Sequence, residues 1–223
     1  MKLKNKSLTI TCDGGAATGK STGAKLISKK YKLAFLSSGL LYRYASYLIL
    51  KHKPKNIIVF LKKKFKNLDY KKLYTINLHT DEISNHCSNI AKILKIRNIL
   101  KIYQKNFIRK NKSCVLEGRD ASTKILPSSD IKFFFTCNIN IAAKRRYKEL
   151  KKKSNRTSYS EVKTAIYKRN KLDRSRRISP LQKHPDAVVV NTSNLDRRAM
   201  IVKMSVYIDK FLKKYGDRRT DKK

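Results

Sequence analysis

One stretch of the sequence decides the fold class: Gly14-Gly15-Ala16-Ala17-Thr18-Gly19-Lys20-Ser21. It fits the pattern G-x-x-x-x-G-K-[ST], and it stands between a short β-branched run at residues 8–12 and a helical pattern that continues to residue 31. Glycines allow such a loop to wrap a phosphate, so that backbone N–H groups and the start of the helix point at negative charge. Lys20 can reach the β- and γ-phosphates, and the Ser21 hydroxyl can ligate Mg²⁺. The sequence therefore predicts a site for a nucleoside triphosphate.

Strand and helix patterns alternate after this loop. Besides residues 8–12, we expect strands at residues 33–36, 114–116, 131–137 and 187–191, with a short candidate strand at 73–78. Helical spacing covers residues 40–50, 57–65, 81–93, 95–109, 141–151, 159–172 and 195–214. The apolar runs at 131–137 and 187–191 are typical of strands buried on both faces of a parallel sheet. The alternation predicts an α/β protein, a three-layer P-loop NTPase fold with a parallel five-stranded sheet.

The composition excludes several classes of protein. The chain has 223 residues, of which 40% are hydrophobic and 9% aromatic, so it can form a core and is not a wholly disordered basic tail. Its apolar runs are far shorter than the roughly 18 residues of a membrane span, and its Lys-rich start does not read as a signal peptide. The four cysteines lack zinc-site spacing, so we expect reduced, structural thiols. We expect a cytoplasmic protein that does not enter a membrane.

The charge leaves a second class of function open. Lys and Arg number 55 against 15 Asp and Glu, a formal net charge of +40, which is typical of nucleic-acid binders. However, the lysines are spread along the whole chain, and no RNP-type aromatic strand, KH loop or zinc finger accompanies them. We therefore expect at most weak, non-specific RNA binding. The alternative is a basic RNA-binding protein that keeps a vestigial nucleotide site.

Two more segments, LSSGLLYR at residues 36–43 and EGRD at 117–120, stand at or just after expected strand ends, where ligands of open parallel sheets bind. A third segment, RNKLDRSRRISPL at residues 169–181, follows them in the chain. Together with CDGGAATGKST at residues 12–22, they resemble the bacterial cytidylate kinases, the type 1 (d)CMP kinases among the nucleoside monophosphate kinases. The resemblance extends from residue 8 to about residue 214. It implies Mg²⁺-assisted transfer of a phosphoryl group from ATP to CMP or dCMP.

The resemblance also implies roles for individual residues. ATP would be held by the loop and its continuation, namely Gly14, Gly15, Ala16, Ala17, Thr18, Gly19, Lys20, Ser21 and Thr22. CMP would be bound by Ser38, Arg43, Ser88, Arg97, Arg119, Asp120, Arg169, Asp173 and Arg176. Within that set, Ser38, Arg43 and Arg119 would hold the phosphate, Ser88, Arg97 and Asp120 would read cytosine, and Arg169 and Asp173 would take the ribose. The residues expected to act in catalysis are Lys20, Arg119, Arg169 and Arg176.

These residue types suit the implied chemistry. Phosphoryl transfer depends mostly on positioning and charge neutralisation, so fixed guanidinium groups matter more than a nucleophilic side chain. The planar fork of arginine matches phosphate oxygens. A carboxylate such as Asp120 can accept a hydrogen bond from the exocyclic amino group of cytosine, which uracil lacks. Ser21 is the expected magnesium ligand, while Asp13 and Glu117 are candidates for support through water.

The sequence departs from the family pattern at several points. Ser37 stands where the family usually has Asp, Gly15 replaces a common Pro, and residues 170–172 lie in a segment usually richer in acids. We expect a core at residues 1–43, 111–146 and 171–214, an NMP-binding insert at 44–110 with a trimmed β element, a lid at about 147–170 and a frayed tail at 215–223. The chain is expected to be a monomer. A UMP or AMP kinase remains the alternative within the enzyme class, although the D-G-[FY]-P-R segment of adenylate kinase is missing.

Overall fold

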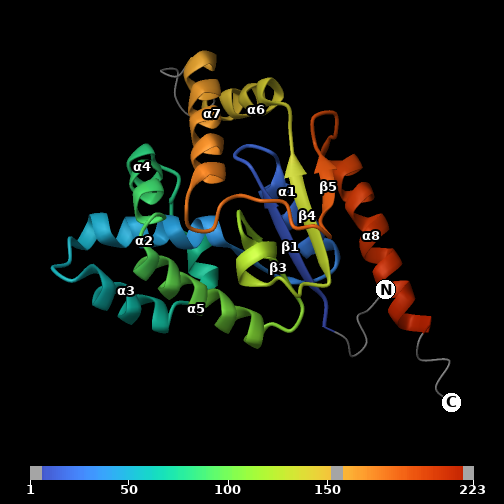
Figure 1. Cartoon of the computed structure of the whole chain (residues 1–223), viewed down its shortest axis with the longest axis horizontal. Coiled ribbons are helices and arrows are strands. Elements are labelled where there is room, and N and C mark those ends of the chain that lie inside the picture. Colours follow the sequence, from blue (N-terminus) through green and yellow to red (C-terminus); the bar gives the residue numbers. More distant parts are fainter. Residues whose placement is uncertain (1–6, 152–157, 218–223) are drawn as a thin grey trace.

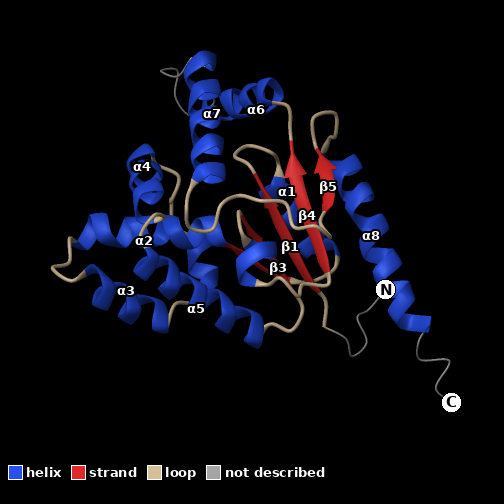
Figure 2. Cartoon of the chain, viewed as in Figure 1, coloured by secondary structure: helices blue, strands red, loops and turns tan. Residues whose placement is uncertain are grey.

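The computed structural model describes residues 7–151 and 158–217. Within them, five strands form one sheet: β1 (Thr9–Gly14), β2 (Ala34–Ser37), β3 (Cys114–Gly118), β4 (Ile131–Thr136) and β5 (Val188–Asn191). Every pairing is parallel, and the strand order is β2-β3-β1-β4-β5 (Figure 2). The predicted five-stranded parallel sheet is confirmed. Residues 152–157 of the expected lid and residues 218–223 of the expected tail lie outside the described residues.

Helices connect the strands and flank the sheet (Figure 1). They are α1 (Lys20–Lys30), α2 (Ser38–His52), α3 (Ile57–Lys66), α4 (Asp81–Ile90), α5 (Leu94–Lys110), α6 (Ile139–Lys151), α7 (Tyr159–Ser175) and α8 (Arg197–Asp217). Several starts are set by side-chain caps: Asn56 and Thr80 each accept from a backbone N–H three residues later. Ser158 and Glu161 form a reciprocal capping box at the start of α7.

The strand expected at residues 73–78 is wrong. The segment begins in a short 3₁₀ helix, Tyr70–Tyr74, whose start is capped by the Asp69 carboxylate accepting the N–H of Lys71 at 3.0 Å. Leu73 is buried in the core cluster beneath α2, α3 and α5. Leu78, at the other end of the segment, is buried as well, so the pattern of polarity reflects separate buried side chains and not a strand. Between α2 and β3, the described chain is helical or irregular and adds no strand to the sheet.

In β2 and β3, alternate residues enter cores on opposite faces of the sheet, as the two-residue period of a strand requires. On one face, Ile10, Val115 and Phe133 pack beneath α1 and α8. On the other, Leu36 and Leu116 pack beneath α2 and α5. α1 approaches the sheet so closely that a Cβ on Gly23 would lie 2.8 Å from the Phe135 ring. These two layers of helices around one sheet confirm the three-layer α/β prediction.

A third, smaller core joins α6 to α7 beyond the carboxyl ends of the strands (Figure 1). It is formed by Ala143, Val162 and Ile166, and Ala16 and Ala17 of the glycine-rich loop pack against it. The hairpin of α6 and α7 is thus seated on the loop that follows β1. This contact brings the sequence motif at residues 169–181 to the same end of the sheet as Lys20.

Two further observations bear on the class of protein. No helix in the ranges 7–151 and 158–217 is long and apolar enough to cross a bilayer. The thiols of Cys12, Cys87, Cys114 and Cys137 are free, as predicted. Burial raises the pKa of Cys12 and of Cys114, to about 11 for the latter, which favours the unreactive protonated form.

Candidate active site

The loop between β1 and α1 has the conformation of a phosphate cradle. Ala17 and Gly19 adopt left-handed backbone angles, with φ values of 57° and 80°, and the chain turns sharply between them. The loop is closed internally, because the Thr18 hydroxyl donates to the Gly15 carbonyl at 3.0 Å. From the far side, the hydroxyl of Thr192, just after β5, donates to the Thr18 carbonyl at 2.8 Å. The loop therefore leads directly into the first turn of α1, whose unpaired N–H groups favour an anion.

Lys20 is buried beside a carboxylate at the end of β3. Its Nζ lies 3.2 Å from Oε1 of Glu117, and the other oxygen of Glu117 accepts from the Ser37 hydroxyl at 2.5 Å. Burial, followed by the charge of Arg119, lowers the pKa of Lys20 to about 8, although Glu117 opposes the shift. Burial alone would raise the pKa of Glu117, but Lys20, the Ser37 hydroxyl and Arg119 outweigh it and hold that pKa below its ordinary value. Ser37 thus orients the carboxylate that orients Lys20.

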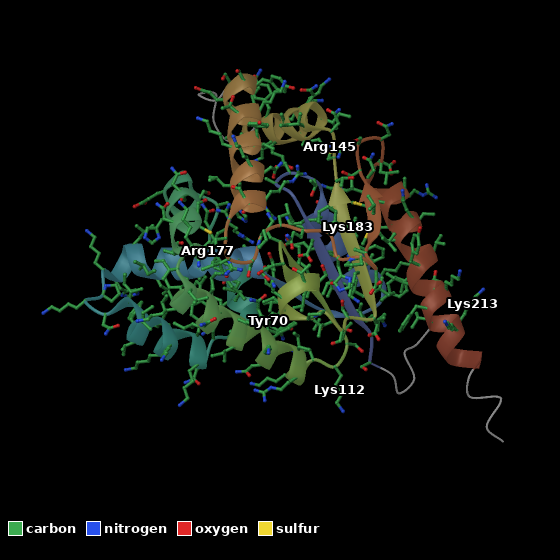
Figure 3. The ribbon with its side chains drawn as sticks, in the orientation of Figure 1. Tyr70, Lys112, Arg145, Arg177, Lys183 and Lys213 are labelled. Atoms are coloured by element: carbon green, nitrogen blue, oxygen red, sulfur yellow. The ribbon has the colours of Figure 1, made fainter. Side chains whose placement is uncertain are left out.

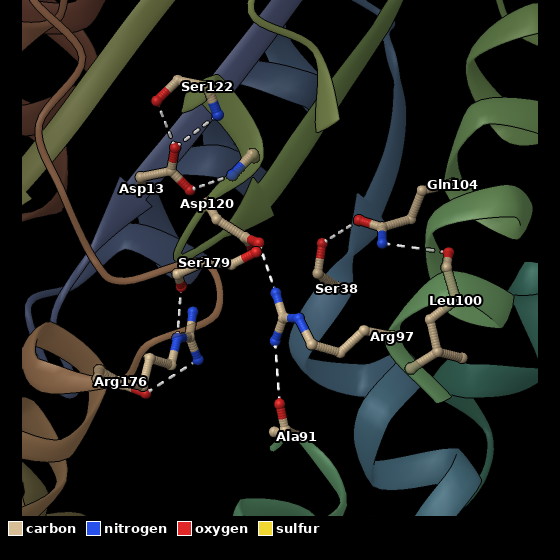
Figure 4. A network of polar contacts seen from close by, with 12 residues as sticks. Asp13, Ser38, Ala91, Arg97, Leu100, Gln104, Asp120, Ser122, Arg176 and Ser179 are labelled. Carbon is tan, nitrogen blue, oxygen red and sulfur yellow. Dashed lines mark hydrogen bonds and ion pairs between the residues drawn. The ribbon is translucent and has the colours of Figure 1, made fainter. Parts of the chain in front are cut away.

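Asp13 connects the strand before the loop to the segment that follows the EGRD motif. Its carboxylate accepts from the N–H of Ala121 at 2.9 Å and from the N–H and hydroxyl of Ser122 at 2.7 and 2.6 Å (Figure 4). Burial raises the pKa of Asp13, while these donors oppose the shift. These three hydrogen bonds use Asp13 to hold the chain next to Asp120. Its role in supporting magnesium through water stays a prediction.

Arginines gather around Asp173 on α7. The Arg119 Nε lies 2.7 Å from Oδ2 of Asp173, and the Arg176 Nη1 lies 3.4 Å from Oδ1. Arg176 also donates to the Ser179 carbonyl (Figure 4). Burial is the main cause that lowers the pKa of Arg169. The nearby charge of Arg119 lowers it further, and that of Asp173 opposes the shift. One carboxylate therefore holds two guanidinium groups, with a third close by.

Another ion pair, between Arg97 and Asp120, lies next to this group. The Arg97 Nη2 donates to Oδ2 of Asp120 at 2.6 Å, and Nη1 donates to the Ala91 carbonyl at 3.2 Å (Figure 4). Both side chains are buried. The Arg97 guanidinium also stands 5.5 Å from the centroid of the Tyr42 ring, within cation–π range. Burial raises the pKa of Tyr42, so its hydroxyl stays protonated.

The remaining residues that were expected to bind CMP do not all lie in the same cluster. Arg43 of α2 donates to the Leu78 carbonyl at 3.0 Å and to the Ser84 hydroxyl at 2.8 Å. Burial is the main cause that lowers the pKa of Arg43, and the nearby charge of Arg119 lowers it further. Ser38 is buried and donates to Gln104 at 2.5 Å. Ser88 is exposed on α4, and its hydroxyl donates back to the Ser84 carbonyl at 3.3 Å. The structure therefore brings the arginines and aspartates together, while Ser88 remains at the edge.

Several residues of this region were not found from the sequence. They are Tyr42 beneath Arg97, Gln104 beside Ser38 and Asn170 against the loop. Arg145 of α6 (Figure 3) is another, because its Nη2 donates to the carbonyls of Thr192, Ser193 and Leu195, and so fixes the turn after β5. Tyr42 and Asn170 lie inside the segments 36–43 and 169–181, which is the signal that could have found them, whereas Gln104 and Arg145 lie outside any motif.

The two halves of this site face the same end of the sheet and complement each other chemically. The glycine-rich loop supplies backbone donors and Lys20 for a chain of phosphates, and the arginines after β3 and on α7 supply fixed cations for a second phosphate group. Transfer of a phosphoryl group between two bound phosphates requires this neutralisation and needs no nucleophilic side chain. The fold and the site therefore define a P-loop kinase whose acceptor also carries negative charge.

The comparisons with known proteins identify the family. Residues 10–210 match the family model described as cytidylate kinase, so the chain belongs to the cytidylate kinase family. Curated relatives named cytidylate kinase include those of Bartonella tribocorum, 36% identical over 213 residues, and Bartonella henselae, 35% identical over the same length. Each alignment covers 93% of this chain and 97% of the relative. The cytidylate kinase of Rickettsia rickettsii is 33% identical over 92% of this chain and 93% of its own.

Solved structures agree on the fold. An uncharacterized protein from Eubacterium ventriosum aligns with a TM-score of 0.52 at 15% identity, covering 91% of this chain and 98% of that one. Shikimate kinase from Bacteroides thetaiotaomicron aligns with a TM-score of 0.50 at 9% identity and the same coverage. At such identities the likeness concerns the fold alone.

Proposed function

We propose that this protein transfers the γ-phosphoryl group of ATP to CMP and dCMP, yielding ADP and CDP or dCDP. The observation that carries the proposal is the excess of fixed positive charge where the two halves of the site meet. Lys20, Arg43, Arg119, Arg169 and Arg176 are accompanied there by the carboxylates of Glu117 and Asp173, while Arg97 and Asp120 neutralise each other. Five cations against two carboxylates leave an unsatisfied demand for anions, which the phosphates of donor and acceptor would meet.

On the donor side, we assign ATP to residues 14–22. Backbone N–H groups of the loop would surround the phosphates, and Lys20 would neutralise the β- and γ-phosphates. Because Glu117 and Ser37 already fix the Lys20 side chain, little ordering is needed when the nucleotide binds. The Lys20 ammonium is then available to stabilise charge as the phosphoryl group moves.

We assign magnesium to the donor side. The Ser21 hydroxyl stands exposed in the first turn of α1, where it fits a cation that takes one or two protein ligands and the substrate phosphates. Glu117 is occupied by Lys20 and Ser37, so Ser21 is the protein ligand we assign. Magnesium, when bound, would neutralise negative charge on the β- and γ-phosphates.

On the acceptor side, we assign the CMP phosphate to Arg43, Arg119 and Ser38. Arg169 and Asp173 would take the ribose hydroxyls, and Arg176 would reach the transferring group. Since Asp173 holds both Arg119 and Arg176, it sets the separation of the two guanidinium groups before CMP arrives. Such pre-positioning lowers the reorganisation needed in the transition state.

Cytosine recognition is assigned to the pair formed by Arg97 and Asp120, with Ser88 in support. Asp120 can accept from the exocyclic amino group, and Arg97 can donate to the acceptors on the same edge of the base. The two side chains are already paired at 2.6 Å and held from behind by Ala91 and Tyr42. A base that lacks the amino group would leave Asp120 with one bond fewer in a buried site.

We propose further that the chain acts as a monomer in the cytoplasm, with residues 44–110 as the CMP-binding insert and residues about 147–170 as a lid that excludes water. Exclusion of water matters because an open site would hydrolyse ATP. Light scattering of the purified chain tests the monomer, and ATP hydrolysis without CMP tests the closure.

The direct test of the function is a coupled assay of ADP release with CMP, dCMP, UMP and AMP as separate acceptors. We expect the largest kcat/KM with CMP or dCMP, and turnover in the roughly 1–100 s⁻¹ range of kinases. AMP or UMP as the best acceptor would overturn the assignment of cytosine. A filter-binding titration with RNA at physiological salt tests the alternative of an RNA-binding protein. Exposed lysines such as Lys112 and Lys213 belong to the basic surface that would bind the RNA (Figure 3).

A further inference from the structure

Asn170 of α7 makes a direct contact with the phosphate-binding loop. Its Oδ1 accepts the backbone N–H of Ala16 at 2.7 Å. Because a backbone N–H can only donate, the contact requires the amide oxygen of Asn170 and not its nitrogen to face the loop. Asn170 stands between Arg169 and Asp173 on the same helix. The contact therefore joins the acceptor side of the site to the donor side by one hydrogen bond.

Gly15 provides the space in which Asn170 lies. A Cβ built on Gly15 would lie 2.9 Å from Oδ1 of Asn170 and 3.3 Å from both Cγ and Nδ2. A distance below 3.0 Å is closer than a Cβ normally approaches, so with a side chain at position 15 the end of Asn170 would have to shift from its place against the loop. Both positions are among those at which the sequence departs from its family pattern. In this chain the two residues are in contact.

Packing holds the same two segments together around this bond. Ala16 and Ala17 pack against the core of the hairpin, which contains Val162 and Ile166 of α7. The apolar contact brings helix and loop together but has no direction of its own. The hydrogen bond at Asn170 adds one, since the side chain meets one particular N–H of the loop, while the Arg119–Asp173 ion pair ties the same helix to the end of β3.

We propose that Asn170 is a positioning residue, which docks α7 on the phosphate-binding loop in one register and so places Arg169 and Asp173 opposite Lys20, with Gly15 as its steric complement. The inference rests on the proposed function, because it gives Asn170 a part in phosphoryl transfer to CMP. Asn170 acts through its neighbours on α7 and does not itself touch the reacting atoms.

A double-mutant cycle tests the pairing of the two positions. Asn170→Ala removes the docking bond, and Gly15→Ala displaces the same side chain, so each is expected to lower kcat roughly tenfold, the upper end of what one hydrogen bond contributes. The double variant should be no worse than either single variant, because the damage is shared. Lys171→Ala, an exposed neighbour on α7, is the matched control and should retain wild-type rates. Effects of the two substitutions that multiply would overturn the pairing.

Asn170→Asp separates docking from general packing. Aspartate keeps an acceptor for the Ala16 N–H but adds negative charge beside the ATP phosphates. We expect its KM for ATP to rise roughly tenfold while its KM for CMP stays within about twofold of wild type. For Asn170→Ala we expect the reverse, with the KM for CMP raised and that for ATP little changed. The same pattern of KM values in both variants would contradict a docking role.

Hydrogen exchange keeps the inference separate from the proposed function. The Ala16 amide should be protected in the ligand-free wild type and in Asn170→Asp, and should exchange roughly tenfold faster in Asn170→Ala. Equal exchange in all three proteins would overturn the docking bond, whatever the activity. A wild-type enzyme that fails to phosphorylate CMP, yet shows this exchange pattern, would instead refute the function and leave the docking intact.

Discussion

The donor and acceptor sides of this site are built in different ways. The donor side is one continuous stretch, a loop of consecutive residues that is closed by its own Thr18–Gly15 bond and is held from outside at Lys20 by Glu117, at Thr18 by Thr192 and at Ala16 by Asn170. The acceptor side is assembled from α2, α5, the end of β3 and α7, and is held by ion pairs between its own members. We therefore expect a substitution on the donor side to lower mainly the rate of phosphoryl transfer. A substitution on the acceptor side should weaken mainly the recognition of CMP.

The largest effect should follow from breaking the donor side. Lys20→Ala is expected to lower kcat by roughly a thousandfold, since a fixed donor to the developing charge is lost. It also leaves Glu117 buried without its partner, which destabilises the fold. Steady-state rates and thermal unfolding measure the two effects separately. The double variant Lys20→Ala, Glu117→Gln should recover stability but not rate, and recovered turnover would show that the loop is misassigned.

The next effect concerns how the acceptor side is held. Asp173→Asn removes the charge that pairs with Arg119 at 2.7 Å and with Arg176 at 3.4 Å. We expect kcat/KM for CMP to fall roughly a hundredfold, because both guanidinium groups lose their fixed positions. The KM for ATP should change by no more than about twofold. Initial rates with CMP and ATP varied in turn measure both constants. An equal loss of kcat/KM for the two substrates would contradict the distinction between the donor and acceptor sides.

A smaller effect sharpens the comparison within the acceptor side. Asp120→Asn is expected to reduce the preference for CMP over UMP roughly tenfold, since one base contact is worth about 1–3 kcal/mol. Arg97 then lies buried beside a neutral partner, so thermal stability should also fall. Asp186→Asn, at an exposed position, is the control. An unchanged ratio of CMP to UMP would mean that this carboxylate does not read the base.

The smallest effect is a pH dependence confined to the donor side. Because the pKa of Lys20 lies at about 8, the free enzyme loses this positive charge as the pH rises through that value. The affinity for ATP should therefore weaken by at most roughly tenfold between pH 7 and pH 9, which calorimetric titration can follow. Lys20→Arg keeps its charge over this range and should show a flat profile. A decline of the same size in that variant would place the titration elsewhere.

Much of the fold followed from local patterns. The apolar strand runs and the helices between them predicted the parallel sheet. The expectation that residues 187–191 are buried on both faces is wrong, because β5 is an edge strand whose Val189 is 44% exposed. The error at residues 73–78 has a physical cause. Alternating polarity there reflects buried anchors such as Leu73 in a 3₁₀ turn capped by Asp69, and short patterns do not distinguish this from a strand.

Much less of the site could be read in this way. The arginines and aspartates were found through motif resemblance, and the structure shows their pairing. Asp13 is a candidate for supporting magnesium through water, and the structure shows that its carboxylate holds the backbone of Ala121 and Ser122, more than a hundred residues away in the sequence. Tyr42 beneath Arg97 depends equally on packing between distant elements. No local pattern records a contact of this kind.

The sequence by itself determined the sheet, the loop that follows β1 and the identity of its lysine, since each depends on neighbours along the chain. Only the tertiary structure decided which carboxylate holds which guanidinium, and that Asn170 meets Ala16 across the space left by Gly15. The reason is physical. A loop conformation is set by the torsion angles of a few adjacent residues, whereas an ion pair between α7 and β3 exists only after the whole core has packed.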